Sequence, residues 1–68
     1  MKAVTGREMC KALERAGWTL KRIKSSHHHY ERPGDPRIVS VPVHAGKTLK
    51  PGMQHGIMRK AGLTEADL

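Results

Sequence analysis

Three consecutive histidines, His27, His28 and His29, are the residues of this sequence best suited to chemistry. An imidazole with its ordinary pKa of about 6.5 can accept or donate a proton near neutral pH, so one of them could act as a general acid or base. Two of them could instead bind a metal ion, and an exposed strand could carry all three without any chemistry. A cloning remnant explains an internal run poorly. The residues alone leave these interpretations open.

The segments around the histidines predict an antiparallel sheet. β-Forming residues alternate with polar ones in Trp18–Ile23, which predicts a half-buried strand, and His27–Arg32 predicts the returning strand. Ile38–Val43 is the clearest strand, with three valines on one face. Turns are expected at Lys24–Ser26 and at Pro33–Pro36.

Strand alternation separates the histidines. His27 and His29 should lie on one face of the sheet, and His28 and Tyr30 on the other. Pro42 cannot donate a backbone hydrogen bond, so its strand should lie at an edge of the sheet.

A helix is expected on each side of these strands. Thr5 and Glu8 predict a capping box at the start of a helix over roughly 5–16, and Pro51 opens a second helix that ends at Gly62. Thr64–Asp67 could cap a last short turn. The predicted buried stripes are Met9, Ala12, Leu13 and Ala16 in the first helix, and Met53, Ile57, Met58 and Ala61 in the second. The sequence thus predicts one α+β domain over 1–68, with the order α-β-β-β-α and both helices on one face of a three-stranded antiparallel sheet.

The charge narrows the classes of partner. Lys and Arg number 13 against 6 Asp and Glu, a formal net charge of +7. This favours a polyanion such as nucleic acid, and a soluble basic surface or one that docks an acidic protein is the alternative. Trp18 and Tyr30 are the only aromatic residues besides histidine, too few to stack a series of single-stranded bases. Because Trp18 immediately follows the helix stop at Gly17, it is expected in the core.

Cysteine count and hydropathy give further expectations. Cys10 is the only cysteine, which excludes an internal disulfide, and no zinc-type Cys/His spacing is present. We therefore expect no metal and no small-molecule cofactor. Cys10 lies beside the apolar stripe of the first helix, so we expect it in or beside the core. No apolar run approaches the roughly 20 residues of a membrane span, and no signal peptide is recognisable. We expect a cytoplasmic protein.

Several motifs, in register, resemble those of the HicA family of bacterial toxins over essentially the whole chain. They are a helix from Gly6 to Gly17 followed by Trp18, Ser26-His27-His28, Val41-Pro42-Val43-His44, Gly46-Lys47 with Leu49-Lys50, and Ile57, Met58, Ala61 and Gly62. The resemblance implies the fold of the double-stranded-RNA-binding domain. It also implies the toxin of a toxin–antitoxin system, a metal-independent mRNA interferase that a HicB-like antitoxin neutralises. A non-catalytic RNA-binding module, or an inactivated toxin that binds an antitoxin, is the alternative.

The resemblance also implies the site, since the family's catalytic histidine falls on His27. His44 and His29 are secondary catalytic candidates, although His29 stands where the family often has an apolar residue and could instead be buried and neutral. Candidate RNA-binding residues are Arg22, Lys24 and Lys47, whose charge could hold a phosphate. The sequence departs from the family pattern at two other positions, with Ser25 in place of a glycine and Met53 in place of a frequent threonine.

Overall fold

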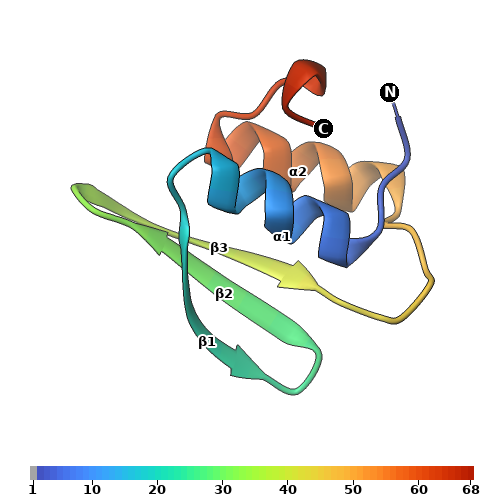
Figure 1. The fold of residues 1–68 in the computed structure, drawn as a ribbon, viewed down its shortest axis with the longest axis horizontal. Coiled ribbons are helices and arrows are strands. Elements are labelled where there is room, and N and C mark those ends of the chain that lie inside the picture. The colour runs from blue at the N-terminus through green and yellow to red at the C-terminus, as the bar shows by residue number, and fades with distance from the viewer. Residues whose placement is uncertain (1) are drawn as a thin grey trace.

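The computed structural model describes residues 2–68, and its elements follow the predicted order (Figure 1). They are α1 (Gly6–Arg15), β1 (Thr19–Lys24), β2 (His27–Arg32), β3 (Asp35–Pro42), α2 (Pro51–Ala61) and a final 3-10 turn, η1 (Glu65–Asp67). The strands form an antiparallel sheet in the order β1-β2-β3, and both helices lie on one side of it. The predicted α+β class is therefore confirmed, as is the edge position of the strand that contains Pro42. No helix between residues 2 and 68 is long and apolar enough to cross a membrane.

The start of α1 is fixed by two independent features. The predicted capping box is present: the Glu8 amide donates to Thr5 Oγ1 at 3.1 Å, and the Thr5 amide donates to Glu8 Oε1 at 2.8 Å. Gly6 then lies so close to the end of β3 that an added Cβ would be 2.3 Å from the Pro42 carbonyl oxygen. Only glycine allows this approach, which ties α1 to the end of β3.

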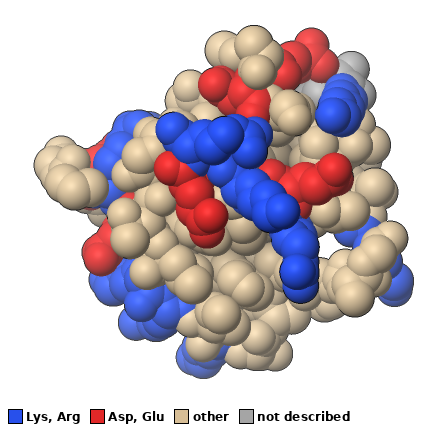
Figure 2. All heavy atoms as spheres, viewed as in Figure 1, with Lys and Arg blue, Asp and Glu red and all other residues tan. Residues whose placement is uncertain are grey.

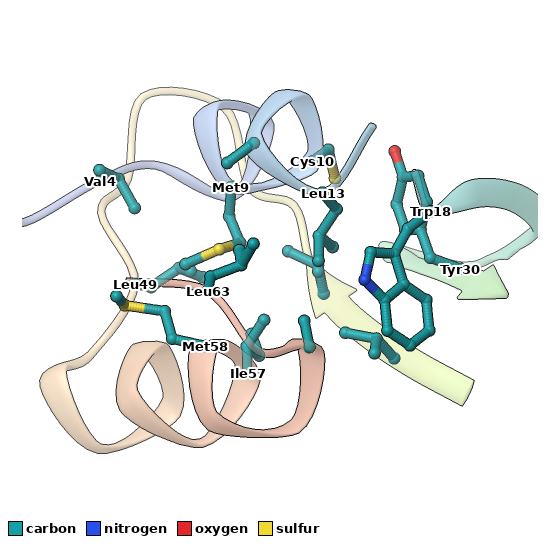
Figure 3. Close-up of a cluster of buried hydrophobic side chains, with 14 residues drawn as sticks. Val4, Met9, Cys10, Leu13, Trp18, Tyr30, Leu49, Ile57, Met58 and Leu63 are labelled. Atoms are coloured by element: carbon teal, nitrogen blue, oxygen red, sulfur yellow. The ribbon is translucent and has the colours of Figure 1, made fainter. Parts of the chain in front are cut away.

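The core lies between the helices and the inner face of the sheet (Figure 3). Tyr30, Val39 and Val41 point into it, as does Trp18, which confirms that Trp18 is a core residue. The fourteen buried apolar residues are Val4, Met9, Cys10, Ala12, Leu13, Trp18, Tyr30, Val39, Val41, Leu49, Ile57, Met58, Ala61 and Leu63. No helix of residues 2–68 lies on the opposite side of the sheet, which we call the open face; it carries Arg22, Lys24, His27, His29, Ser40 and Pro42.

The third strand begins earlier than predicted. It starts at Asp35 instead of Ile38, and the turn before it contains only Pro33–Gly34, because Gly34 has φ 79° and allows an immediate reversal. Arg32 then pairs with Asp35 across the hairpin. The Asp35 carboxylate also accepts hydrogen bonds from the Arg37 amide at 2.9 Å and from the Arg37 guanidinium at 2.7 Å. Asp35 and Pro36, which the sequence predicted as part of the turn, therefore belong to β3.

The first strand is not half-buried, as the sequence predicted, but exposed along its whole length. Leu20 and Ile23 are 41% and 55% exposed, although their register partners Tyr30 and His28 are buried and half-buried. The helices pack mainly over β3, so the inner side of β1 has only partial cover from α1 (Figure 1).

The predicted buried stripe of α2 is wrong at one position. Met53 is 48% exposed, and Gln54 is buried in its place, at 1% exposure. Gln54 Oε1 accepts the Val4 amide at 3.2 Å, and its Nε2 donates to the Lys2 carbonyl. The helix is therefore turned so that an amide side chain satisfies the backbone of the N-terminal segment, which a hydrophobic pattern does not reveal.

Candidate active site

The turn between β1 and β2 places His27 at the start of β2. Lys24 pairs with His27, so the turn contains only Ser25 and Ser26. Ser25 has φ 57°, a left-handed conformation that glycine adopts most easily. The serine therefore keeps the backbone shape expected from a glycine at this position, and His27 follows at the exposed end of the hairpin.

The predicted division of the histidines between the two faces of the sheet is confirmed. Tyr30 is buried in the core and His28 is half-buried on the same face, so His27 and His29 lie on the open face. The rings of His27 and His29 are stacked, with centroids 6.5 Å apart and an interplanar angle of 27°. Two imidazoles thus share one exposed surface, within reach of a single phosphodiester group.

His29 is oriented by β3. Its Nδ1 lies 2.6 Å from Ser40 Oγ, and Ser40 is its register partner. Partial burial is the main cause that lowers the pKa of His29, and the positive charge of Arg22 lowers it further, followed by His27. His29 is half-buried and lies beside His27. Because its pKa is lowered, it favours the neutral form. Neutral histidine can accept a proton.

Arg22 and Lys24 stand beside the two histidines. Arg22 is the register partner of His29 and Lys24 that of His27, and paired residues of an antiparallel sheet project from the same face. The ion pairs found within residues 2–68 use Lys21, Arg32 and Arg37, so the charges of Arg22 and Lys24 are not neutralised by a carboxylate there. Two of the predicted RNA-binding residues thus lie next to His27.

Most carboxylates have structural partners away from this surface. Glu8 caps α1, and Glu14 accepts a hydrogen bond of 2.9 Å from the Tyr30 hydroxyl. Asp35 binds Arg37, whose hydrogen bonds to that carboxylate hold the pKa of Asp35 well below its usual range. Asp67 accepts the Thr64 amide at 2.6 Å. Glu31, two residues beyond His29 on β2, pairs with Lys21 at 3.9 Å, so no ion pair within residues 2–68 compensates Arg22 or Lys24.

The other two candidates, His44 and Lys47, lie on the loop between β3 and α2. They line an open cavity of about 380 Å³, which we call the loop cavity; Pro42, Thr48, Leu49, Lys50 and Met53 complete its wall. Pro42 is the register partner of His27, so the cavity adjoins the open face at the end that carries His27. His44 and Lys47 thus lie in the loop cavity, next to the open face. No hydrogen bond or ion pair between described residues joins either of them to His27.

Sequence reasoning did not identify Ser40 and Lys50. Ser40 lies between the buried Val39 and Val41, so strand alternation alone would have placed it on the face of His29. Lys50, the N-cap residue of α2, gave no comparable signal, because its place in the loop cavity depends on how the loop folds back. Met53 lies in the same cavity instead of in the core.

Within the part of the chain that the structure describes, no three His, Cys, Asp or Glu side chains come close enough together to hold a metal ion.

This arrangement agrees with a family comparison. The family described as the HicA toxin of bacterial toxin-antitoxin matches residues 6–63 of the 68. The chain belongs to the HicA toxin family. The match covers both helices, all three strands, both hairpin turns and the loop cavity, which confirms the resemblance found in the sequence. No curated protein matches the chain.

Membership makes this HicA chain the toxin partner of a toxin–antitoxin pair, and so implies a second protein that opposes it.

Proposed function

We propose that this HicA toxin is a metal-independent endoribonuclease that cleaves mRNA, with His27 as its catalytic residue. The observation that carries the proposal is the position of His27. It is exposed at the start of β2, stacked with His29 and opposite Lys24, on a face where no helix blocks access. An imidazole beside uncompensated cations can transfer protons while the cations hold a phosphate.

The reaction needs only groups that the RNA and the protein supply. The ribose 2′-oxygen attacks the adjacent phosphorus and gives up its proton, and the bond from phosphorus to the 5′-oxygen breaks. The leaving 5′-oxygen takes up a proton, so the products are a 2′,3′-cyclic phosphate and a 5′-hydroxyl. His27 performs one of these proton transfers. His29, which favours its neutral form, stands beside it as the second imidazole.

The cations of the open face would bind the RNA backbone. Arg22 and Lys24 offset the charge that develops on the phosphate oxygens, and they do so from the strand next to His27. The loop cavity continues this surface beyond Pro42 and adds Lys47 and His44, where a neighbouring nucleotide could be bound. The scarcity of exposed aromatic side chains indicates that the backbone, more than stacked bases, gives the affinity.

The proposed context is that of a cytoplasmic toxin. Its substrate would be mRNA, and a HicB-like antitoxin would neutralise it. No small molecule or cofactor enters the proposed reaction.

His27→Ala tests the proposal directly. Cleavage of a defined mRNA in EDTA should fall by about 100-fold or more, since one positioned acid or base contributes at least that much. The melting temperature should change little, because His27 is exposed. His55→Ala is the matched control, an exposed histidine on α2, and should cleave at the parent rate.

Three results would contradict the proposal. His27→Ala could cleave at the rate of the parent, or the parent could lose activity in EDTA and regain it with zinc or manganese. The parent could also bind RNA without cutting it, which would make the chain an RNA-binding module.

A further inference from the structure

The loop cavity is framed by backbone hydrogen bonds at both ends of its loop. The Val43 amide donates to the Ser26 carbonyl at 2.8 Å, which ties the start of the loop to the turn before His27 (Figure 1). At the other end, the Leu49 amide donates to the Val4 carbonyl at 2.8 Å, and the Leu49 side chain is buried in the core. A hollow framed in this way is largely preformed, as binding sites for small ligands commonly are.

The residues that line the cavity include two lysines and no carboxylate. Lys47 and Lys50 form no ion pair within residues 2–68. No Asp or Glu occurs from Pro36 to Thr64, a stretch that contains nearly all of β3, the loop and the whole of α2. In Figure 2 the loop, at the lower right of the view, carries basic side chains beside uncharged ones, and the acidic side chains lie elsewhere. A phosphate in the cavity would therefore meet uncompensated positive charge.

Part of the lining is apolar. Met53 is 48% exposed, and Pro42 and Leu49 line the cavity with it. Met53 also borders a smaller hollow of about 250 Å³ that is lined by Ser40, the residue that contacts His29. Its side chain is thus available to a ligand at the side of the proposed site. A thioether makes favourable contacts with aromatic rings, so this part of the lining suits a nucleobase.

Two further polar side chains line the cavity without partners of their own. Neither the Thr48 hydroxyl nor the His44 imidazole forms a hydrogen bond in the part of the chain that the structure describes. Both groups can donate and accept hydrogen bonds, as the edge of a base requires. The cavity volume of about 380 Å³ falls within the range of about 300–1,000 Å³ that is usual for small-ligand sites. Cations, apolar surface and hydrogen-bonding groups for a single nucleotide therefore meet in one hollow.

We infer that the loop cavity binds one nucleotide of the RNA beside the one cut at His27, with phosphate held by Lys47 and Lys50 and the base against Met53. This inference rests on the proposed function, since it assigns the cavity to the RNA that His27 cuts. A purine is preferred to a pyrimidine, because its larger ring system buries more apolar area against Met53. Met53 is then a specificity-determining residue, separate from the side chains that transfer protons.

The first test measures affinity with RNA that cannot be cut. The probe is a pentanucleotide of purines with every 2′-oxygen methylated, compared with the same sugar–phosphate chain without bases. The bases should increase the affinity of the parent, and Met53→Ala should reduce that gain by about three- to tenfold, the worth of a methionine–aromatic contact. Ile23→Ala is the matched control: it truncates an exposed hydrophobic residue on the inner face of the sheet and should keep the full gain.

The two lysines should act on the backbone and not on the base. Combining Lys47→Gln with Lys50→Gln should weaken the binding of both probes equally. It should also lower the slope of log affinity against log salt concentration by at least about 0.7, the value for one phosphate contact on a single strand. Lys11→Gln with Arg59→Gln removes the same charge from exposed positions on the two helices and should leave the slope unchanged.

Cleavage separates this inference from the proposed RNase activity. The pentanucleotide with one free 2′-hydroxyl can be cut at that position only. Met53→Ala should raise its KM and leave kcat near that of the parent, as loss of a contact made equally in the ground and transition states does. His27→Ala should abolish cleavage and keep the full gain in affinity from the bases.

Three results would overturn the inference. Met53→Ala could keep the full gain in affinity from the bases, Ile23→Ala could lose that gain equally, or the double lysine variant could keep the parental salt slope. A parent that binds the pentanucleotide without cutting it would instead contradict the proposed function, and the affinities of the uncut probes would still decide whether the cavity binds a nucleotide.

Discussion

Ser40 on β3 and His29 on β2 are joined across the sheet by a 2.6 Å contact between Oγ and Nδ1. The contact holds the ring of His29 through its Nδ1. It also sets the spacing of the two stacked imidazoles, since His27 lies two residues away on the same strand. Ser40 is thus a positioning residue in the proposed site, although no sequence motif includes it.

Ser40→Ala should slow cleavage of mRNA by about tenfold, because a misoriented acid or base loses part of its contribution. Ser40→Thr keeps the hydroxyl on a side chain suited to a strand and should restore most of the rate. The pH–rate profile of Ser40→Ala should also move, since the hydroxyl contacts the ionising ring. A purely structural role would predict a loss that follows thermal stability in both variants and leaves the profile unchanged.

His29 should make the stability of the fold depend on pH. Its pKa is lowered from the ordinary value of 6.5, mainly by partial burial and then by Arg22. The unfolded chain therefore binds more protons than the folded one at mildly acidic pH. The contribution of His29 to stability is complete above pH 6.5 and is lost as the pH falls through the lowered pKa.

His29→Gln should therefore flatten the fall in melting temperature between neutral and mildly acidic pH. Thermal unfolding followed by circular dichroism at a series of pH values would measure this. An unchanged pH dependence in the variant would show that His29 does not carry the effect.

The sequence predicted the order of the elements and the face of each histidine because both depend on local signals. The capping box, the alternation of valines around Ser40 and the turn residues are all short-range. The family motif pointed to His27, which is exposed at the start of β2.

What the sequence did not predict depends on contacts between distant segments. Gln54 replaces Met53 in the core because it binds the backbone of Lys2 and Val4, about fifty residues away. Leu20 and Ile23 have the pattern of a half-buried strand, yet the helices leave that side of β1 largely uncovered. Hydrophobic periodicity reports which residues share a face, but not whether another element covers that face.

Gly6 and Gly56 offer a matched pair for stability. An alanine Cβ at Gly6 would overlap the Pro42 carbonyl, so Gly6→Ala should destabilise the fold by about 1–3 kcal/mol, the cost of overpacking. Gly56 lies inside α2, where an added Cβ meets nothing within 4 Å, so Gly56→Ala should stabilise by about 0.5–1 kcal/mol. Urea unfolding of both variants measures these changes. Equal effects of the same sign would refute the close packing of α1 against β3.

Arg22 provides the test of the open face as the RNA surface. Binding of a single-stranded RNA should weaken with salt, and each phosphate contact adds about 0.7 to the slope of log affinity against log salt concentration. Arg22→Gln should therefore reduce both the affinity and the slope, the latter by about 0.7 if Arg22 makes one such contact. Arg59→Gln removes the same charge from an exposed position in the last turn of α2 and should leave the slope unchanged.

Fluorescence anisotropy at several salt concentrations gives both quantities, with His27→Ala as the background so that the RNA stays intact. A slope that falls equally in both variants would mean that net charge, and not the open face, binds the RNA. A slope unchanged in Arg22→Gln would remove β1 from the RNA path and leave the loop cavity as the surface to test.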